Sequence, residues 1–90
     1  MRLDQWLWAV RVFKSRSLAA DAIKTGCVEV DGQEAKPAHE IRPEEVITVH
    51  FVERDRILRV LGAPPSRVAA KFVPEYAAEE QPSLGSKTAT

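Results

Sequence analysis

The sequence predicts a small α+β domain, with two packed N-terminal helices followed by a mainly antiparallel sheet and a short C-terminal helix. Three observations lead to this prediction. Apolar residues recur at helical spacing near the N-terminus, and Gly26 then stops a second helical stretch. Beyond it, Val28 and Val30 alternate with polar residues and run into the tight-turn dipeptide Asp31-Gly32. Helical periodicity giving way to alternation within one short chain indicates helices packed beside a sheet.

The first helix is expected over residues 2–12. Its apolar residues fall on one stripe about 120° wide, the width of a single core-facing side. They are Leu3, Trp6, Leu7, Val10 and Phe13. Trp8 and Val12 lie off this stripe, and Trp8 is predicted to pack against the C-terminal segment. The functional alternative for Trp8 is stacking on a nucleobase.

The second helix is expected over residues 17–25, joined to the first by a short turn. Ser15 or Ser17 is the expected N-cap, because a serine oxygen can accept an unpaired backbone N–H of the first turn. Lys14 and Arg16 flank this helix start, where cations oppose the helix dipole unless an anion is bound. Backbone N–H groups, dipole and cations together predict a phosphate site here.

The following residues predict a hairpin and two further strands. The first strand turns at Asp31-Gly32 and returns through residues 33–36, where Pro37 ends it. Residues 38–45 are expected to form a loop or one helical turn. Residues 47–51 alternate between apolar and polar, and residues 57–61 are expected to pair with them across a turn at residues 53–56.

Ser66 is predicted to cap a short third helix that ends before Pro74. From Ala77 onward the chain offers little to bury. The expected organisation is therefore a single domain over residues 1–76 and a flexible tail over residues 77–90.

The chain as a whole has the composition of one small soluble domain of 90 residues. Asp4 and two tryptophans stand where a signal peptide would need an uninterrupted apolar run, so a cytoplasmic location without membrane association is expected. The single cysteine, Cys27, cannot form an internal disulfide, and no clustered partner residues suggest a metal site. A monomer without a cofactor is predicted.

Charge is unevenly distributed along the chain although the net charge is zero. Residues 1–27 carry five cations and two anions, whereas residues 28–62 carry five cations and eight anions. A basic helical half therefore precedes an acidic strand-rich half. In such a chain a local patch decides nucleic-acid binding more than the overall charge does.

Several motifs occur in a characteristic order along the first half of the chain. They are Arg2-Leu3-Asp4-x-Trp6-Leu7-Trp8, Phe13-Lys14-x-Arg16-Ser17-Leu18-Ala19, Gly26-x-Val28-x-Val30-Asp31-Gly32 and Lys36-Pro37. The series resembles the S-four domain, the RNA-binding domain named after the fourth protein of the small ribosomal subunit. It is most similar to the free-standing, ribosome-associated branch that includes the bacterial heat-shock protein of fifteen kilodaltons. Where this family usually has Gly-Asp before the third strand, the chain has Glu44-Glu45, which predicts a differently shaped turn.

The resemblance implies an S-four-like fold (alpha-L motif) that binds structured RNA, either ribosomal or tRNA-like, with the ribosome as a further expected partner. It places a set of basic residues on the binding face: Arg2, Arg11, Lys14, Arg16, Lys24 and Lys36. Ser15 or Ser17 could add a hydroxyl contact. Arg16 is the principal candidate, because its planar guanidinium suits a bidentate phosphate contact and no acidic residue lies within four positions. Asp4 is expected to orient Arg11, about two helical turns away.

Two other functional classes remain as alternatives, and no enzyme is predicted. A DNA-binding helix-turn-helix protein would need base-reading polar side chains on the second helix, which offers mainly Ala20, Asp21 and Lys24. A protein-interaction adaptor would need exposed apolar area, for which Trp8 with Val12 is the candidate. No catalytic arrangement of residues and no glycine-rich phosphate loop is recognisable in the sequence.

Overall fold

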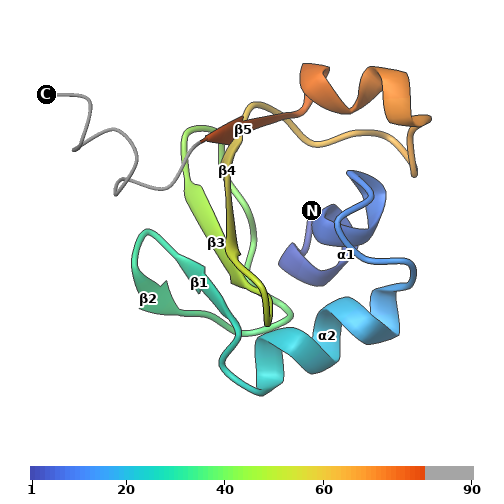
Figure 1. Ribbon diagram of the computed structural model, residues 1–90. Helices are drawn as coiled ribbons and strands as arrows, with labels where there is room; N and C mark the ends of the chain where they lie inside the picture. Colours follow the sequence, from blue (N-terminus) through green and yellow to red (C-terminus); the bar gives the residue numbers. More distant parts are fainter. Residues whose placement is uncertain (81–90) are drawn as a thin grey trace, which may run out of the picture.

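The computed structural model describes residues 1–80, in which two helices lie beside a five-stranded sheet (Figure 1). The elements in chain order are α1 (Leu3–Ala9), α2 (Arg16–Lys24), β1 (Val28–Val30), β2 (Gln33–Glu34), β3 (Val46–His50), β4 (Asp55–Val60), the 3-10 helix η1 (Ala70–Glu75) and β5 (Ala77–Glu80). The strand order is β2-β1-β3-β4-β5, and all neighbours are antiparallel. The predicted α+β class is confirmed. No helix within residues 1–80 is long and apolar enough to cross a membrane.

α1 is shorter than the predicted helix over residues 2–12. Arg11 has a φ of 66°, in the left-handed region that ends a helix. The N–H of Arg11 bonds the carbonyl of Trp8 at 3.1 Å, and the N–H of Val12 bonds that of Leu7 at 3.0 Å. These two bonds form a Schellman motif, which is usually built on glycine. An arginine at this position gave no sequence signal for the helix end.

α2 begins and ends as its sequence signals predict. Ser15, rather than Ser17, is the N-cap, and its hydroxyl oxygen accepts from the N–H of Leu18 at 3.1 Å. At the other end Gly26 has a φ of 84°, and the N–H of Cys27 bonds the carbonyl of Ala22 at 3.0 Å. The second helix therefore ends in the same motif as the first, here with the glycine that the motif favours.

The hairpin between β1 and β2 turns at Asp31-Gly32, as predicted. Asp31 and Gly32 have φ values of 52° and 82°, the positive pair that a type I′ turn requires. The side chain of Asp31 also accepts from the N–H of Val46 at 2.9 Å, so the turn is fixed to the start of β3. The return strand β2 covers only Gln33–Glu34, not residues 33–36, because the chain then leaves the sheet to run alongside the N-terminus.

Glu44 occupies the position where a glycine is usual in the family that the sequence resembles. Its φ of 76° lies in the left-handed region, so the turn has a backbone conformation that glycine would favour despite the change of residue. The N–H of Glu44 bonds the carbonyl of Val60, and the N–H of Val60 bonds the carbonyl of Glu45. These bonds fix the turn to the end of β4.

The C-terminal part differs from the prediction in two respects. The third helix is the 3-10 helix η1, which begins at Ala70 rather than near Ser66 and contains Pro74. Residues 77–80, expected to start a flexible tail, instead form β5, which pairs with β4. Arg56 holds this strand through two 2.7 Å bonds to Glu79, which also lower the pKa of the Glu79 carboxyl. The remainder of the predicted tail, residues 81–90, lies outside the described residues.

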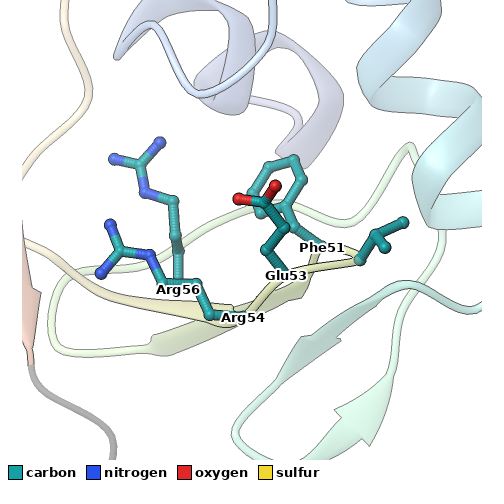
Figure 2. A pocket seen from close by; sticks show the side chains of 5 residues that line it. Phe51, Glu53, Arg54 and Arg56 are labelled. Carbon is teal, nitrogen blue, oxygen red and sulfur yellow. The ribbon is translucent and has the colours of Figure 1, made fainter.

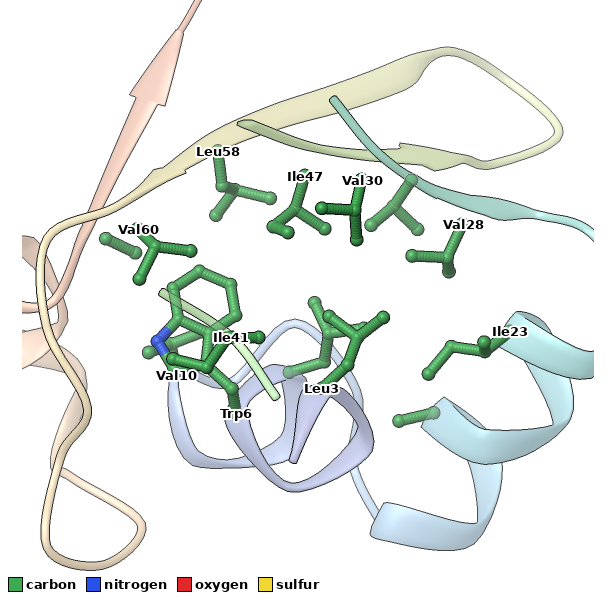
Figure 3. Close-up of a cluster of buried hydrophobic side chains, with 14 residues drawn as sticks. Leu3, Trp6, Val10, Ile23, Val28, Val30, Ile41, Ile47, Leu58 and Val60 are labelled. Carbon is green, nitrogen blue, oxygen red and sulfur yellow. The ribbon is translucent and has the colours of Figure 1, made fainter. Parts of the chain in front are cut away.

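The core lies between α1, α2 and the sheet (Figure 3). Leu3, Trp6 and Leu7 of the predicted stripe are fully buried. The indole N–H of Trp6 donates to the carbonyl of Gly62 at 3.0 Å, so the largest core side chain also keeps its polar group paired. The sheet contributes its inward alternating residues, which are Val28, Val30, Ile47, Val49, Leu58 and Val60.

His50 should make the stability of the sheet depend on pH. Its hydrogen bond with Asp55 (Nδ1–Oδ1 2.8 Å), aided by the nearby charge of Glu29, raises the pKa of His50 above its ordinary value of 6.5. A raised folded-state pKa contributes stability below the unfolded pKa, and that stability is lost as pH rises through the folded value. The free energy of unfolding from denaturant titrations should therefore fall as the pH rises above about 6.5, by less than about 1 kcal/mol because the pair is exposed. His50→Gln should remove this component, and an identical pH profile for the variant would contradict the assignment.

Candidate nucleic-acid interface

The start of α2 is the place where several predicted RNA-binding residues come together, around the carboxylate of Asp4. Asp4 is 4% exposed and is the one charged residue among residues 1–80 that is fully buried. Arg2 binds it side-on, with Nε 3.2 Å from Oδ1 and Nη2 3.1 Å from Oδ2. Nη2 of Arg16 lies 3.5 Å from the same Oδ1. One buried anion therefore contacts two guanidiniums from separate parts of the chain.

Asp4 was expected to orient Arg11, and the structure corrects this expectation. Positions 4 and 11 share a face only if the helix continues through both, and α1 ends at Ala9. Arg16 has no acidic residue within four positions of it along the sequence, but the fold brings Asp4 beside it in space. The two arginines at Asp4 nevertheless remain accessible, since the side chains of Arg2 and Arg16 are 47% and 46% exposed.

Backbone hydrogen bonds place Asp4 and bring Lys36 close to it. The N–H of Asp4 donates to the carbonyl of Pro37 at 3.2 Å, and the N–H of Leu3 donates to that of His39 at 2.7 Å. The N-terminal segment thus lies along the chain that follows β2. Lys36 directly precedes Pro37, so its backbone is next to the group formed by Asp4 and its two arginines.

The remaining predicted residues on α2 and directly before it are mostly exposed. Lys14, Ser17 and Lys24 all have exposed side chains. Lys24 lies eight residues after Arg16, about 12 Å along the helix axis. Ser15 is partly buried because its hydroxyl oxygen caps the helix, although its O–H can still donate. These residues extend a basic surface from the start of α2 towards its end.

Arg11 lies in a different place, in a contact between the end of α1 and residues 67–68. Its Nε donates to the carbonyl of Val68 at 2.6 Å. In the opposite direction, Arg67 donates to the carbonyls of Trp8 at 3.1 Å and Phe13 at 3.4 Å. This reciprocal exchange, called the arginine clasp below, holds the segment before η1 against the helix pair. The position of Arg67 in the chain gave no hint of it, because its partners are backbone carbonyls far away in sequence.

Trp8 is half-buried and has the C-terminal contact that the sequence predicted for it. The guanidinium carbon of Arg67 lies 5.7 Å from the centroid of its ring. This cation–π contact belongs to the arginine clasp.

The exposed apolar side chains lie elsewhere than the Trp8 and Val12 patch suggested for an adaptor. Phe51 and Val52, at the turn between β3 and β4, are 37% and 104% exposed and line an open hollow of about 450 Å³ with Glu53, Arg54 and Arg56 (Figure 2). The ring of Phe51 contacts that of Phe13, with centroids 5.7 Å apart. This turn is thereby attached to the loop that leads into α2. Residues 1–80 contain no cluster of side chains suited to hold a metal ion.

The fold and this basic helix pair define a class of protein. A family model described as the S4 domain matches residues 1–47, more than half of the chain, and the chain belongs to this family. The resemblance predicted from the ordered motifs is thereby confirmed.

Similar relatives place the chain with the free-standing members of this family. The chain is 38% identical over 84 residues to a heat shock protein 15 homolog of Aeromonas salmonicida, covering 93% of this chain and 64% of the relative. It is 34% identical over 64 residues to the RQC P-site tRNA stabilizing factor of Helicobacter pylori, covering 71% of this chain and 76% of the relative. The chain thus spans less than two thirds of the length of the Aeromonas protein.

A solved structure agrees with both the fold and the family. Heat shock protein 15 of Vibrio cholerae, described as trimeric, superposes with a TM-score of 0.87 at 29% identity. The match covers 99% of this chain and 90% of the other. The arrangement of helices and antiparallel strands is therefore that of an experimentally known S4-domain protein.

Replacing Arg11 tests whether the arginine clasp stabilises the fold. Arg11→Gln removes a charged donor to the Val68 carbonyl and should lower the free energy of unfolding by about 1 kcal/mol, which is below the usual range for a charged hydrogen bond because the site is exposed. Lys14→Gln is the matched control, since it removes an exposed cation three residues away and should stay within about 0.5 kcal/mol of wild type. Denaturant titration measures both. Equal stability of the two variants would show that the clasp contributes nothing.

Proposed function

We propose that the chain binds structured RNA on or near the ribosome, through the basic surface that runs from the Asp4 group along α2. The observation that supports this most directly is the pair of half-exposed guanidiniums at the start of α2. Both are paired on their inner side to Asp4, yet each keeps N–H groups for which residues 1–80 supply no acceptor. The oxygens of a phosphate suit such N–H groups, because a guanidinium can bind two of them at once.

The helix start strengthens this surface as an anion site. α2 has nine residues and carries no acidic residue in its first turn. The hydroxyl oxygen of Ser15 accepts a hydrogen bond from the N–H of Leu18. No described residue accepts from the backbone N–H groups of Arg16 and Ser17. Unpaired N–H groups and the positive end of the dipole favour a bound anion. Lys14, Lys24 and Lys36 would then act as less directional phosphate contacts.

The names of the relatives indicate the class of RNA. The Helicobacter pylori protein is named for stabilising a P-site tRNA, which points to a ribosome carrying tRNA. Ribosomal RNA or a tRNA-like RNA is therefore the proposed partner, and the cytoplasm is the corresponding location. On this view the protein acts by binding and not by catalysis.

DNA binding is the alternative that the helix pair itself suggests. After Arg16 at its first position, the exposed side of α2 offers Asp21 and Lys24 rather than further forked amide or guanidinium groups that could read base edges. RNA binding by phosphate and 2′-hydroxyl contacts does not need such groups.

Competition binding between a structured RNA and duplex DNA of equal length tests the proposal. At one fixed salt concentration, the protein should bind the RNA at least about tenfold more tightly, because A-form shape and 2′-hydroxyl groups add to a phosphate attraction that both nucleic acids share. Fluorescence anisotropy with each unlabelled competitor gives the ratio. Equal affinity, or preference for DNA, would refute RNA recognition and favour the helix-turn-helix alternative.

Single substitutions on α2 test where the RNA binds. Arg16→Ala should weaken binding by about 1 to 3 kcal/mol and reduce the salt slope by about one, since it removes one phosphate contact. Lys24→Ala should act in the same direction but more weakly. Lys71→Ala is the control, because it removes an exposed cation from η1, which lies at the other end of the molecule from α2 (Figure 1). If Arg16→Ala matched Lys71→Ala in affinity and salt slope, the binding surface would lie elsewhere.

A further inference from the structure

We propose that Asp4 is a positioning residue for RNA binding, whose buried carboxylate holds Arg2 and Arg16 side by side so that together they receive one phosphate. The inference rests on the proposed function and assigns to an acidic residue a role in recognising a polyanion.

The geometry of the contacts supports this role. Oδ1 of Asp4 contacts Nε of Arg2 at 3.2 Å and Nη2 of Arg16 at 3.5 Å, so one oxygen atom joins the two guanidiniums. Oδ2 contacts Nη2 of Arg2 at 3.1 Å and completes a bidentate pair. Two long side chains from α2 and from the residue before α1 are thereby held at the same point.

Burial separates the anion from the surface that RNA would meet. The side chain of Asp4 is 6% exposed, whereas those of Arg2 and Arg16 are 47% and 46% exposed. The carboxylate thus lies beneath the guanidiniums, where a phosphate would not meet it directly. No residue among residues 1–80 accepts from Nη1 of Arg2 or from Nε and Nη1 of Arg16, which leaves N–H groups on both arginines for two oxygens of one phosphate.

The position of Asp4 is itself fixed. Its backbone N–H donates to the carbonyl of Pro37. Asp4 also lies in the first turn of α1, and α1 packs into the hydrophobic core. A rigid anchor reduces the rotamer freedom that each arginine would otherwise lose on binding RNA. The two arginines are thus arranged before RNA arrives.

Positioning and bulk electrostatics predict opposite results when the charge of Asp4 is removed. If only net charge mattered, loss of an anion beneath a phosphate site would tighten RNA binding. If Asp4 positions the arginines, its loss weakens binding although the protein becomes more positive. The sign of the change therefore separates the two explanations.

The test compares Asp4→Asn with Asp21→Asn, which removes an exposed anion from α2. RNA affinity is measured over a range of salt concentrations, at a temperature well below the melting transition of each variant. Asp21→Asn should bind as wild type or more tightly. Asp4→Asn should bind about three- to tenfold more weakly, the factor expected when about one ordered side chain is released. Asp4→Glu should recover part of the loss because it restores the carboxylate.

A double substitution shows whether Asp4 acts through Arg16. In the Arg16→Ala background, Asp4→Asn should weaken binding less than it does in the wild type, because one of the positioned groups is already gone. A purely structural role of Asp4 would lower stability without this coupling in affinity.

A measurement on the unaltered protein provides a second test that does not depend on the folding of a variant. NMR order parameters of the arginine Nε–H groups in the RNA-free protein should be higher for Arg2 and Arg16 than for Arg54, which makes no side-chain hydrogen bond within residues 1–80. Equal mobility of all three would overturn the proposal.

The outcomes also distinguish this inference from the proposed function. If Asp4→Asn folds and binds RNA as tightly as wild type or more tightly, while Arg16→Ala still weakens binding, positioning by Asp4 is refuted and RNA binding by α2 stands. If the unaltered protein does not bind structured RNA at all, both are refuted.

Discussion

The need to pair the buried carboxylate of Asp4 determines how the basic surface of this protein is built. An unpaired charge in this position would be strongly destabilising, so at least one cation must approach it. Arg2 and Arg16 supply two such cations, Arg2 from the position before α1 and Arg16 from the first position of α2. The same contacts that satisfy the anion collect guanidiniums at the start of α2. The same guanidinium groups thus neutralise the buried carboxylate and form the candidate phosphate site.

Pairing elsewhere explains how a chain of zero net charge can present a basic surface. On the sheet, Arg56 and Arg59 are bound by Glu79 and Glu80 and hold β5 in place. The cations of β4 are thereby neutralised by acidic neighbours. Lys14, just before α2, and Lys24, at its end, have no such partner within residues 1–80. The uneven charge seen in the sequence therefore corresponds to a sheet whose arginines are paired and a helix face whose lysines are not.

The predictions that failed share a physical cause, which is the dependence of local structure on distant contacts. α1 ends early because Arg11 takes the left-handed conformation, and the bond from Arg11 to Val68 adds a contact 57 residues away along the chain. β5 was missed because residues 77–80 have neither the alternation nor the β-branched residues of a strand, and they become one by pairing with β4. Neither event has a signal within a short window of sequence.

By itself the sequence determined the fold class, the family, a serine cap at the start of the second helix, the stop at Gly26 and the turn at Asp31-Gly32, whereas the choice of Ser15 over Ser17 came from the structure. The cap, the stop and the turn depend on the chemistry of a few adjacent residues, so short sequence motifs predict them. Only the tertiary structure decided which cations Asp4 pairs with and which predicted basic residues gather at α2. Ion pairs between residues far apart in sequence depend on where the core places their backbones, and spacing along the chain does not contain that information.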